Sequence, residues 1–198
     1  MSVPSANRVF INAPFDAAYE PLFVTLVGML VFLGQKPHCV LEVREQGDGR
    51  LSRIYELMRS CRMSIHDLSR VGTPVRFNMP FELGLACGLK LAQPSAYEVV
   101  VLDAKAYRMD RLISDYKGRD PLIHDGTSDG MAACLLDAFE TPTPFPPAEL
   151  REAVRVLREL AETMKKDLKS DSLFRPSLYR SLGALAEDIA KARGFIAP

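Results

Sequence analysis

The chain contains 198 residues, of which 47% are hydrophobic, and its 25 Lys and Arg residues balance 25 Asp and Glu residues. This apolar content is typical of a folded globular protein and excludes a disordered chain. The formal net charge of zero excludes a global basic field, so we expect no nucleic-acid partner.

The first third of the sequence alternates short apolar runs with longer segments of helical period. Arg8 to Asn12 predicts a buried strand that ends before Pro14. Glu20 to Leu33 predicts a helix with a proline in its first turn, so apolar that it must be covered on most sides. Pro37 to Val43 fits a second strand, and Leu51 to Cys61 fits an amphipathic helix.

The next stretch predicts a strand over Met63 to Leu68, a polar loop, and then a helix with Glu82 in its first turns. Three apolar residues of this helix recur at helical spacing and predict its buried face: Phe81, Leu85 and Leu89. Gly84 and Gly88 predict a thin face that could approach a sheet closely. Glu82 lies off the apolar row, where an exposed carboxylate would interact favourably with the helix dipole.

Two further strands and a helix follow in the predicted core. Tyr97 to Leu102 predicts a fourth strand, and Pro121 to His124 is a candidate for a short fifth one. Thr127 to Phe139 predicts a helix that Ser128 or Asp129 could cap. Because strands alternate with helices, we expect a three-layer α/β fold with a parallel sheet and helices on both of its faces.

A proline-rich segment separates this core from the C-terminal region. Residues 141–147, TPTPFPP, contain four prolines and predict a stiff linker between a domain of residues 1–140 and a helical hairpin of residues 148–198. Ala148 to Lys169 and Pro176 to Arg193 each carry an apolar stripe. These stripes must pack on each other, on the core or on another subunit. We therefore expect a homo-oligomer formed through the C-terminal helices.

Cysteine usage and hydropathy predict the compartment. The four cysteines stand singly in apolar segments without metal-ligand spacing, so we expect reduced core thiols and no metal. The start of the sequence lacks the pattern of a secretory signal. The longest apolar run, Leu22 to Leu33, is shorter than the roughly 20 residues that a bilayer span needs. We expect a cytoplasmic protein without a membrane partner.

Polar residues gather at the predicted carboxyl ends of the strands, where open α/β sheets bind ligands. The candidate substrate-binding and catalytic residues are Asn12, Pro14, Phe15, Asp16, Asp67, Ser69, Arg70, Arg76, Asn78 and Glu82. Carboxylates can hold ribose hydroxyls, an aromatic ring can stack on a base, and Arg can pair with phosphate. Core packing explains Phe15 as well as base stacking does. Solvation of a loop explains Arg76 as well as phosphate binding does. The sequence lacks GxGxxG and GxxxxGK[ST] motifs, so a glycine-rich phosphate loop is not supported.

Three segments, VFINAPFD, SIHDLSR and NMPFELGLA, resemble the TIR-like and nucleoside 2-deoxyribosyltransferase-like proteins. The resemblance covers roughly Arg8 to Leu102 and implies a flavodoxin-like fold, whose parallel sheet would have the strand order 2-1-3-4, extended by the fifth strand if it forms. In the deoxyribosyltransferases the glutamate that matches Glu82 is the nucleophile on the sugar, and in TIR domains it supports cleavage of the nicotinamide–ribose bond of NAD. NAD or a related nucleotide small molecule would then be the substrate, and no separate cofactor is expected.

The sequence also departs from the TIR pattern at two places. Asn12 stands where the TIR strand VFIS has serine, and Met79, Pro80 and Phe81 replace the Trp and Cys that precede the glutamate. N-glycoside cleavage passes through an oxocarbenium-like state that a carboxylate can stabilise. Glu82 could serve in that role, while Asp67 could orient ribose hydroxyls or water. His66 alternates with Asp67 along the strand, which favours a structural histidine on the other side of the sheet.

Four interpretations of function follow. The first is an NAD(P)-cleaving, TIR-like N-glycosidase, which as in many TIR-like bacterial proteins would be an antiphage defence effector. The second is a non-catalytic sensor of a nucleotide or second messenger on the same fold. The third is a nucleoside 2-deoxyribosyltransferase. The fourth, a pure self-assembly module, needs no convergent Asp67 and Glu82 and so explains the central stretch worst.

Overall fold

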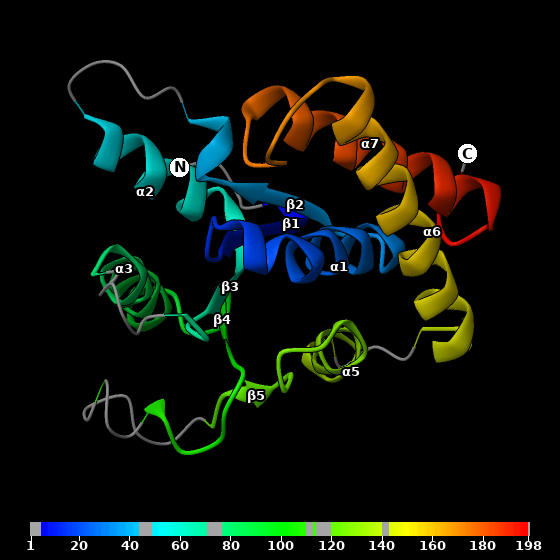
Figure 1. The fold of residues 1–198 in the computed structure, drawn as a ribbon. Coiled ribbons are helices and arrows are strands. Elements are labelled where there is room, and N and C mark those ends of the chain that lie inside the picture. The colour runs from blue at the N-terminus through cyan, green and yellow to red at the C-terminus, as the bar shows by residue number, and fades with distance from the viewer. Residues whose placement is uncertain are drawn as a thin grey trace. The chain divides into compact units, whose positions relative to one another are not determined.

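A computed structural model of the protein describes residues 5–43, 49–70, 77–109, 113, 120–139 and 143–197 (Figure 1). It contains a sheet of five parallel strands in the order β2-β1-β3-β4-β5 together with α-helices. This arrangement confirms the predicted α/β fold and is consistent with a flavodoxin-like architecture. The fifth strand, which the sequence left open, forms next to β4.

The strands are β1 (Ser5–Asn12), β2 (Lys36–Cys39), β3 (Cys61–Asp67), β4 (Glu98–Asp103) and β5 (Leu122–Ile123). The register pairs Asn12 with His66, Asp67 with Leu102, and Asp103 with Ile123. Strand β2 is shorter than predicted because the chain turns into a 3-10 helix over Val40–Glu42. The Glu42 carboxylate accepts a hydrogen bond from the Cys39 N–H, which begins that turn.

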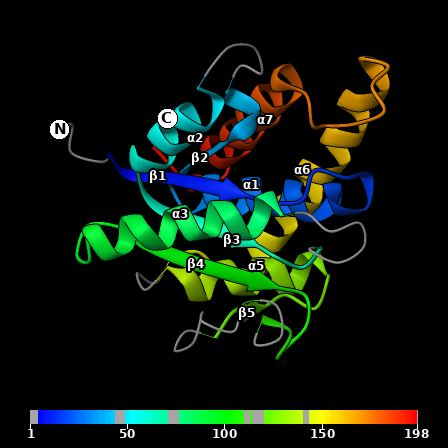
Figure 2. The ribbon, with the colours of Figure 1, turned by 90° about the vertical axis from the view of Figure 1, so that its left-hand side faces the viewer.

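The chain forms two compact units, and the first contains residues 1–14 and 38–126. This sheet unit carries helices α2 (Arg50–Arg59) and α3 (Asn78–Ala92). One apolar cluster joins alternate residues of the strands to both helices: Phe10, Val99 and Val101 with Ile54, Met58, Met79, Leu83, Ala86 and Leu89. Figure 2 shows α3 running in front of β3 and β4.

The face of α3 that packs on the sheet differs from the predicted one. The buried residues are Met79, Glu82, Leu83, Ala86 and Leu89. Phe81, which the sequence placed on the buried row, is 53% exposed. The glycines were expected to face the sheet, yet a Cβ built on either Gly84 or Gly88 would meet no atom within 4 Å. The spacing of the apolar residues did not identify the buried face, because α3 is apolar on nearly all sides and its periodicity is weak.

The second unit contains residues 15–37 and 127–198 and is helical. Helix α1 (Glu20–Phe32) contacts α5 (Ser128–Ala138), α6 (Pro147–Asp167) and α7 (Pro176–Ala192). All residues of α1 except Pro21 are buried, which confirms that this apolar helix is covered on most sides. The described residues of the predicted linker, 143–147, lie within this unit.

The apolar stripes of α6 and α7 are used inside the chain. Their buried residues are Leu150, Ala153, Val154, Leu157 and Ala161 in α6, and Leu178, Tyr179, Leu182, Ala186 and Ala190 in α7. Both helices pack on α1 and on each other, although Leu160 of the predicted α6 stripe is 40% exposed. Because α1 covers these stripes, they no longer require a second subunit, and an oligomer through them stays a prediction.

Polar contacts fasten the helical unit at its ends. The buried Glu20 carboxylate accepts a hydrogen bond from Leu173 N at 2.7 Å and pairs with Lys165. The Tyr179 hydroxyl donates to the Pro37 carbonyl at 2.8 Å. Helix α5 is capped by Thr127, whose Oγ1 accepts from Gly130 N, rather than by Ser128 or Asp129. The cap lies one residue earlier than predicted because Thr127 is the last extended residue before the helix.

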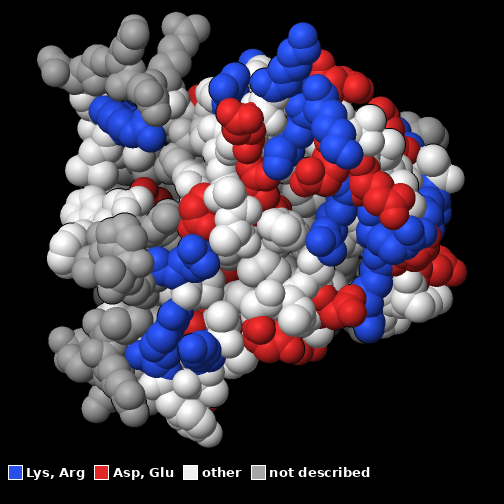
Figure 3. All heavy atoms as spheres, in the orientation of Figure 1, with Lys and Arg blue, Asp and Glu red and all other residues white. Residues whose placement is uncertain are grey.

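Charged side chains of both signs are interspersed on the face of the molecule in Figure 3, so the balanced composition appears there as mixed charge. Across the residues that the structure describes, no helix is long and apolar enough to cross a membrane.

Candidate functional site

The carboxyl edge of the sheet unit carries a buried acid and a buried histidine in close contact. Asp67, the last residue of β3, accepts a hydrogen bond from Ser69 N at 2.8 Å. Its Oδ2 lies 3.1 Å from Nε2 of His124, outside hydrogen-bond alignment, and both side chains are fully buried. His124 Nδ1 accepts from Gly126 N at 3.1 Å. A ring that accepts through Nδ1 carries its proton on Nε2, the nitrogen nearer to Asp67.

An arginine clamp lies beside this pair and was not predicted. Arg108 grips both oxygens of Asp103, the last residue of β4, at 3.0 and 2.7 Å. The same guanidinium donates to the backbone carbonyl groups of Leu68 and Ser69. It thereby ties the end of β4 to the chain that leaves β3. Asp103 follows a buried strand as Asp67 does, and that shared position is the signal that could have found it.

An amide and a histidine connect β1, β3 and the start of α3. Asn12 Nδ2 lies 3.0 Å from His66 Nδ1 and donates to the Met79 carbonyl at 3.0 Å. Both protons of the amide are used, so Asn12 is turned into the protein interior. Burial lowers the pKa of His66 to about 3, which keeps its ring neutral at physiological pH. The ring lies on the side of the sheet that carries α3 and Glu82 rather than on the opposite side as predicted, and a purely structural role for His66 stays a prediction.

Glu82 is a buried carboxylate at this same end of the sheet. It lies one turn after Met79, whose carbonyl is held by Asn12 at the end of β1. The side chain is only 7% exposed, and its Oε2 is buried without a hydrogen-bond partner in the described part of the chain. Burial raises the pKa of Glu82 to about 7, opposed by the charge of Arg50. The alternative of an exposed helix-dipole carboxylate is therefore wrong.

The other predicted site residues of the sheet unit are spread along its carboxyl edge. Pro14 is buried, and Ser69 is half-buried with its N–H and C=O both bonded. Arg70, after β3, and Asn78, the first residue of α3, are exposed. Arg76 lies outside the described residues.

Phe15 and Asp16 belong to the helical unit. The Phe15 ring packs against Phe23 and Phe174, with centroids 5.8 and 5.2 Å apart. For Phe15 the structure shows the core-packing alternative. The Asp16 carbonyl accepts from Tyr19 N and begins a short 3-10 turn over Ala17–Tyr19.

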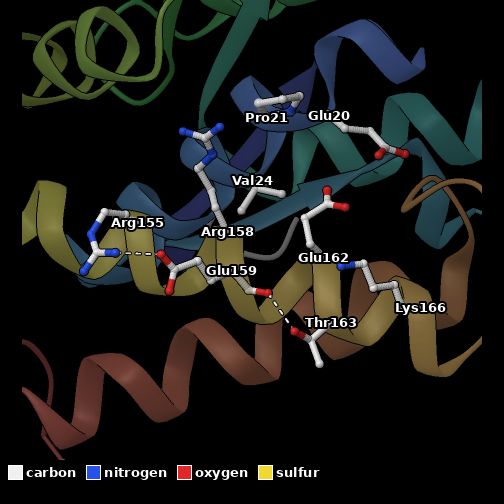
Figure 4. Close-up of a pocket in the computed structure, with 9 residues that line it drawn as sticks. All are labelled: Glu20, Pro21, Val24, Arg155, Arg158, Glu159, Glu162, Thr163 and Lys166. Carbon is white, nitrogen blue, oxygen red and sulfur yellow. Dashed lines mark hydrogen bonds and ion pairs between the residues drawn. The ribbon is translucent and has the colours of Figure 1, made fainter.

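The helical unit has a hollow of about 460 Å³ on α1 and α6 (Figure 4). It is lined by Glu20, Pro21, Val24, Arg155, Arg158, Glu159, Glu162, Thr163 and Lys166. None of these is a predicted site residue. Its charges are mixed, since Arg155 pairs with Glu159 at 2.6 Å and Glu162 lies 3.6 Å from Lys165. The hollow therefore selects no ligand class by charge.

Comparison with protein-family models and with curated proteins finds no match for this sequence. Among the described residues, no three His, Cys, Asp or Glu side chains are grouped so that they could hold a metal ion. The chemistry of the carboxyl edge therefore carries the functional assignment.

Proposed function

We propose that the protein cleaves the N-glycosidic bond of a nucleotide, with Glu82 as the catalytic carboxylate. The observation that carries the proposal is the buried, unpartnered Oε2 of Glu82 at the carboxyl end of an open parallel sheet, where such folds bind ligands. A carboxylate left without a partner in the interior is costly unless it interacts with something that binds there. The resemblance of the surrounding segments to TIR-like and deoxyribosyltransferase-like proteins supports the same reaction class.

The reaction requires a negative charge facing a developing positive one. As the base leaves, the anomeric carbon and ring oxygen acquire oxocarbenium character, which an ionised Glu82 would stabilise or capture. Exclusion of water from the site strengthens this interaction. Because the pKa of Glu82 is about 7, only part of the protein carries the reactive ion at neutral pH. The rate should therefore rise with pH through about 7.

The internal contacts revise the expected role of Asp67. Its oxygens face His124 and Ser69 in the interior, so we assign it to positioning the end of β3 rather than to gripping ribose. Arg70 and Asn78 are exposed at the same edge and are the described residues best placed to contact a phosphate or sugar. The substrate in this proposal is NAD, NADP or a nucleoside. With a base in place of water as acceptor, the same site would be a deoxyribosyltransferase.

A second candidate is a non-catalytic nucleotide or second-messenger sensor. The contacts of two other carboxylates favour it: Asp67 lies against His124, and Asp103 pairs with Arg108. A module that only binds a nucleotide does not need a second carboxylate that faces the ligand beside Glu82. The two candidates predict different effects of removing the charge of Glu82. An enzyme loses turnover, whereas a sensor keeps binding and shows no turnover to lose.

The deciding experiment measures release of free base from a panel of NAD, NADP and nucleosides. We expect wild type to release base and Glu82→Gln to be slower by a factor of ~10²–10³, the effect of losing one transition-state charge interaction. Glu56→Gln, which changes an exposed carboxylate in α2, is the matched control and should keep full rate. Nucleotide binding by wild type without base release from any member of the panel would establish the sensor instead.

The role of a defence effector depends on the same chemistry. An enzyme that consumes NAD arrests the growth of the cell that makes it, so expression of wild type should stop bacterial growth and Glu82→Gln should not. Equal growth of the two strains, at equal protein levels, would separate the protein from that role.

A further inference from the structure

The outward side of α3 is an apolar stripe that nothing in the described structure covers. Phe81 is 53% exposed and Leu91 is 81% exposed, and Phe77, just before the helix, is 78% exposed. Gly84 and Gly88 lie between them, also exposed, with no atom within 4 Å of a Cβ built on either. Figure 2 shows this helix in front of β3 and β4 of its own unit. The thin face predicted for α3 thus points outward.

The stripe also lacks the charges that normally cover the solvent side of a helix. The two charged residues of α3 are Glu82, which is buried, and Lys90, which bonds to the Pro94 carbonyl and to Glu98, each at 2.6 Å. Two exposed glycines in one helix destabilise that helix relative to alanine. Helices that cross closely use glycines in this way, because the missing Cβ lets the two backbones approach.

We propose that this face binds a second copy of the chain through an antiparallel crossing of two α3 helices. The stripe Phe81, Gly84, Gly88, Leu91 has the spacing 3-4-3, which is symmetric about its centre. In a two-fold interface residue i meets residue j, and j meets i. A two-fold axis through the centre of the stripe places Gly84 against Gly88 of the second copy. It also places Phe81 against Leu91 of the second copy, so large residues meet at both ends and glycines meet in the middle.

The area of the stripe predicts how strongly two copies would associate, and its charge disfavours a membrane as the partner. The three large side chains expose roughly 400 Å², about the largest apolar patch that a monomer usually shows. Two copies would bury roughly 800 Å² through them, below the ~1,200–2,000 Å² of stable interfaces, so the dimer should be weak and in rapid exchange with the monomer. A membrane surface is disfavoured, because interfacial helices carry free Lys or Arg and Lys90 is already paired.

The first test uses charge complementation in the full-length chain, with sedimentation velocity over a concentration series. We expect wild type to dimerise, and Phe81→Lys and Leu91→Glu to be monomeric when each is alone. Mixing the two variants should restore a dimer, because one crossing then pairs the new ammonium with the new carboxylate while the other keeps Phe81 against Leu91. A parallel arrangement would pair each residue with itself and show no rescue.

The second test uses the glycines, where one substitution should have opposite effects on the stability of the monomer and on the affinity of the dimer. Gly84→Ala should raise the Tm of the monomer, since alanine favours a helix, and should weaken the dimer at least tenfold. Leu168→Glu, which changes an exposed leucine of the helical unit, is the control and should leave association unchanged. A wild-type chain that stays monomeric up to about 1 mM, or a dimer that Gly84→Ala and Phe81→Lys leave intact, overturns the proposal. The inference does not depend on the role of Glu82.

Discussion

The sheet unit and the helical unit bury very different amounts of charge. Among the described residues, the carboxyl edge of the sheet buries five titratable side chains: His66, Asp67, Glu82, Asp103 and His124. Among the described residues of the helical unit, one charged side chain is buried, Glu20, and it is held by Lys165 and Leu173 N. Buried charge is costly unless it is paired. An edge that concentrates it is organised for more than stability, whereas the helical unit is organised for packing.

Helices α1 and α3 show the same difference in another form. Both are apolar on nearly all sides, and in both the sequence alone leaves the buried face open. Three helices cover α1, whereas α3 keeps Phe81 and Leu91 exposed. Other helices of the chain thus cover the apolar surface of α1. The described residues leave part of the apolar surface of α3 uncovered.

The largest expected effect tests whether charge pairing holds the sheet edge together. Arg108→Ala should lower the free energy of unfolding by about 3–5 kcal/mol, because it leaves Asp103 buried and unpaired and removes donors from the Leu68 and Ser69 carbonyls. Denaturant unfolding measures the change. Arg62→Ala, which removes an exposed guanidinium from β3, is the control. A loss for Arg108→Ala no greater than that of the control would mean that the clamp contributes little.

The next effect tests whether apolar packing holds the helical unit. Leu157 is fully buried in α6, and its Cδ2 lies 2.6 Å from the position that a Cβ on Gly28 of α1 would take. Leu157→Ala should cost about 2–5 kcal/mol of unfolding free energy through the cavity it leaves. Leu160→Ala, one turn later and 40% exposed, should cost less than about 1 kcal/mol. Similar losses for the two variants would show that α6 does not pack on α1 as described.

The smallest expected effect is the pH dependence of stability that the buried Glu82 gives to the sheet unit. The pKa of Glu82 is raised from 4.5 to about 7 by burial, so between these values only the folded state holds the proton. Wild type should therefore lose stability as pH rises from 4.5 to about 7, and then level off. Glu82→Gln lacks this loss and should be more stable than wild type by up to roughly 3 kcal/mol at pH 8, with little difference at pH 4. Unfolding free energies at the two pH values measure it; a constant difference would mean that Glu82 titrates normally.

The alternation of strands and helices could be predicted from the sequence because it follows from local periodicity. The predicted segments for β1, α1, β3, β4, α6 and α7 match the structure to within a few residues. Asp67 and Glu82 could be placed at the carboxyl edge for a related reason, since parallel strands and the helices after them share that edge. The parallel direction of the strands followed from their alternation with helices, whereas the strand order came from the resemblance to flavodoxin-like proteins.

Only the tertiary structure decided which side of each element is buried and which polar groups meet. The exposure of Phe81 and the burial of Glu82 depend on how α3 packs against the β-strands, because α3 has no polar face that would orient it. Arg108 reaches Ser69 across 39 positions of sequence, and His124 lies 57 positions beyond its partner Asp67. Local periodicity cannot report such contacts, because they exist only once the sheet brings the strand ends together.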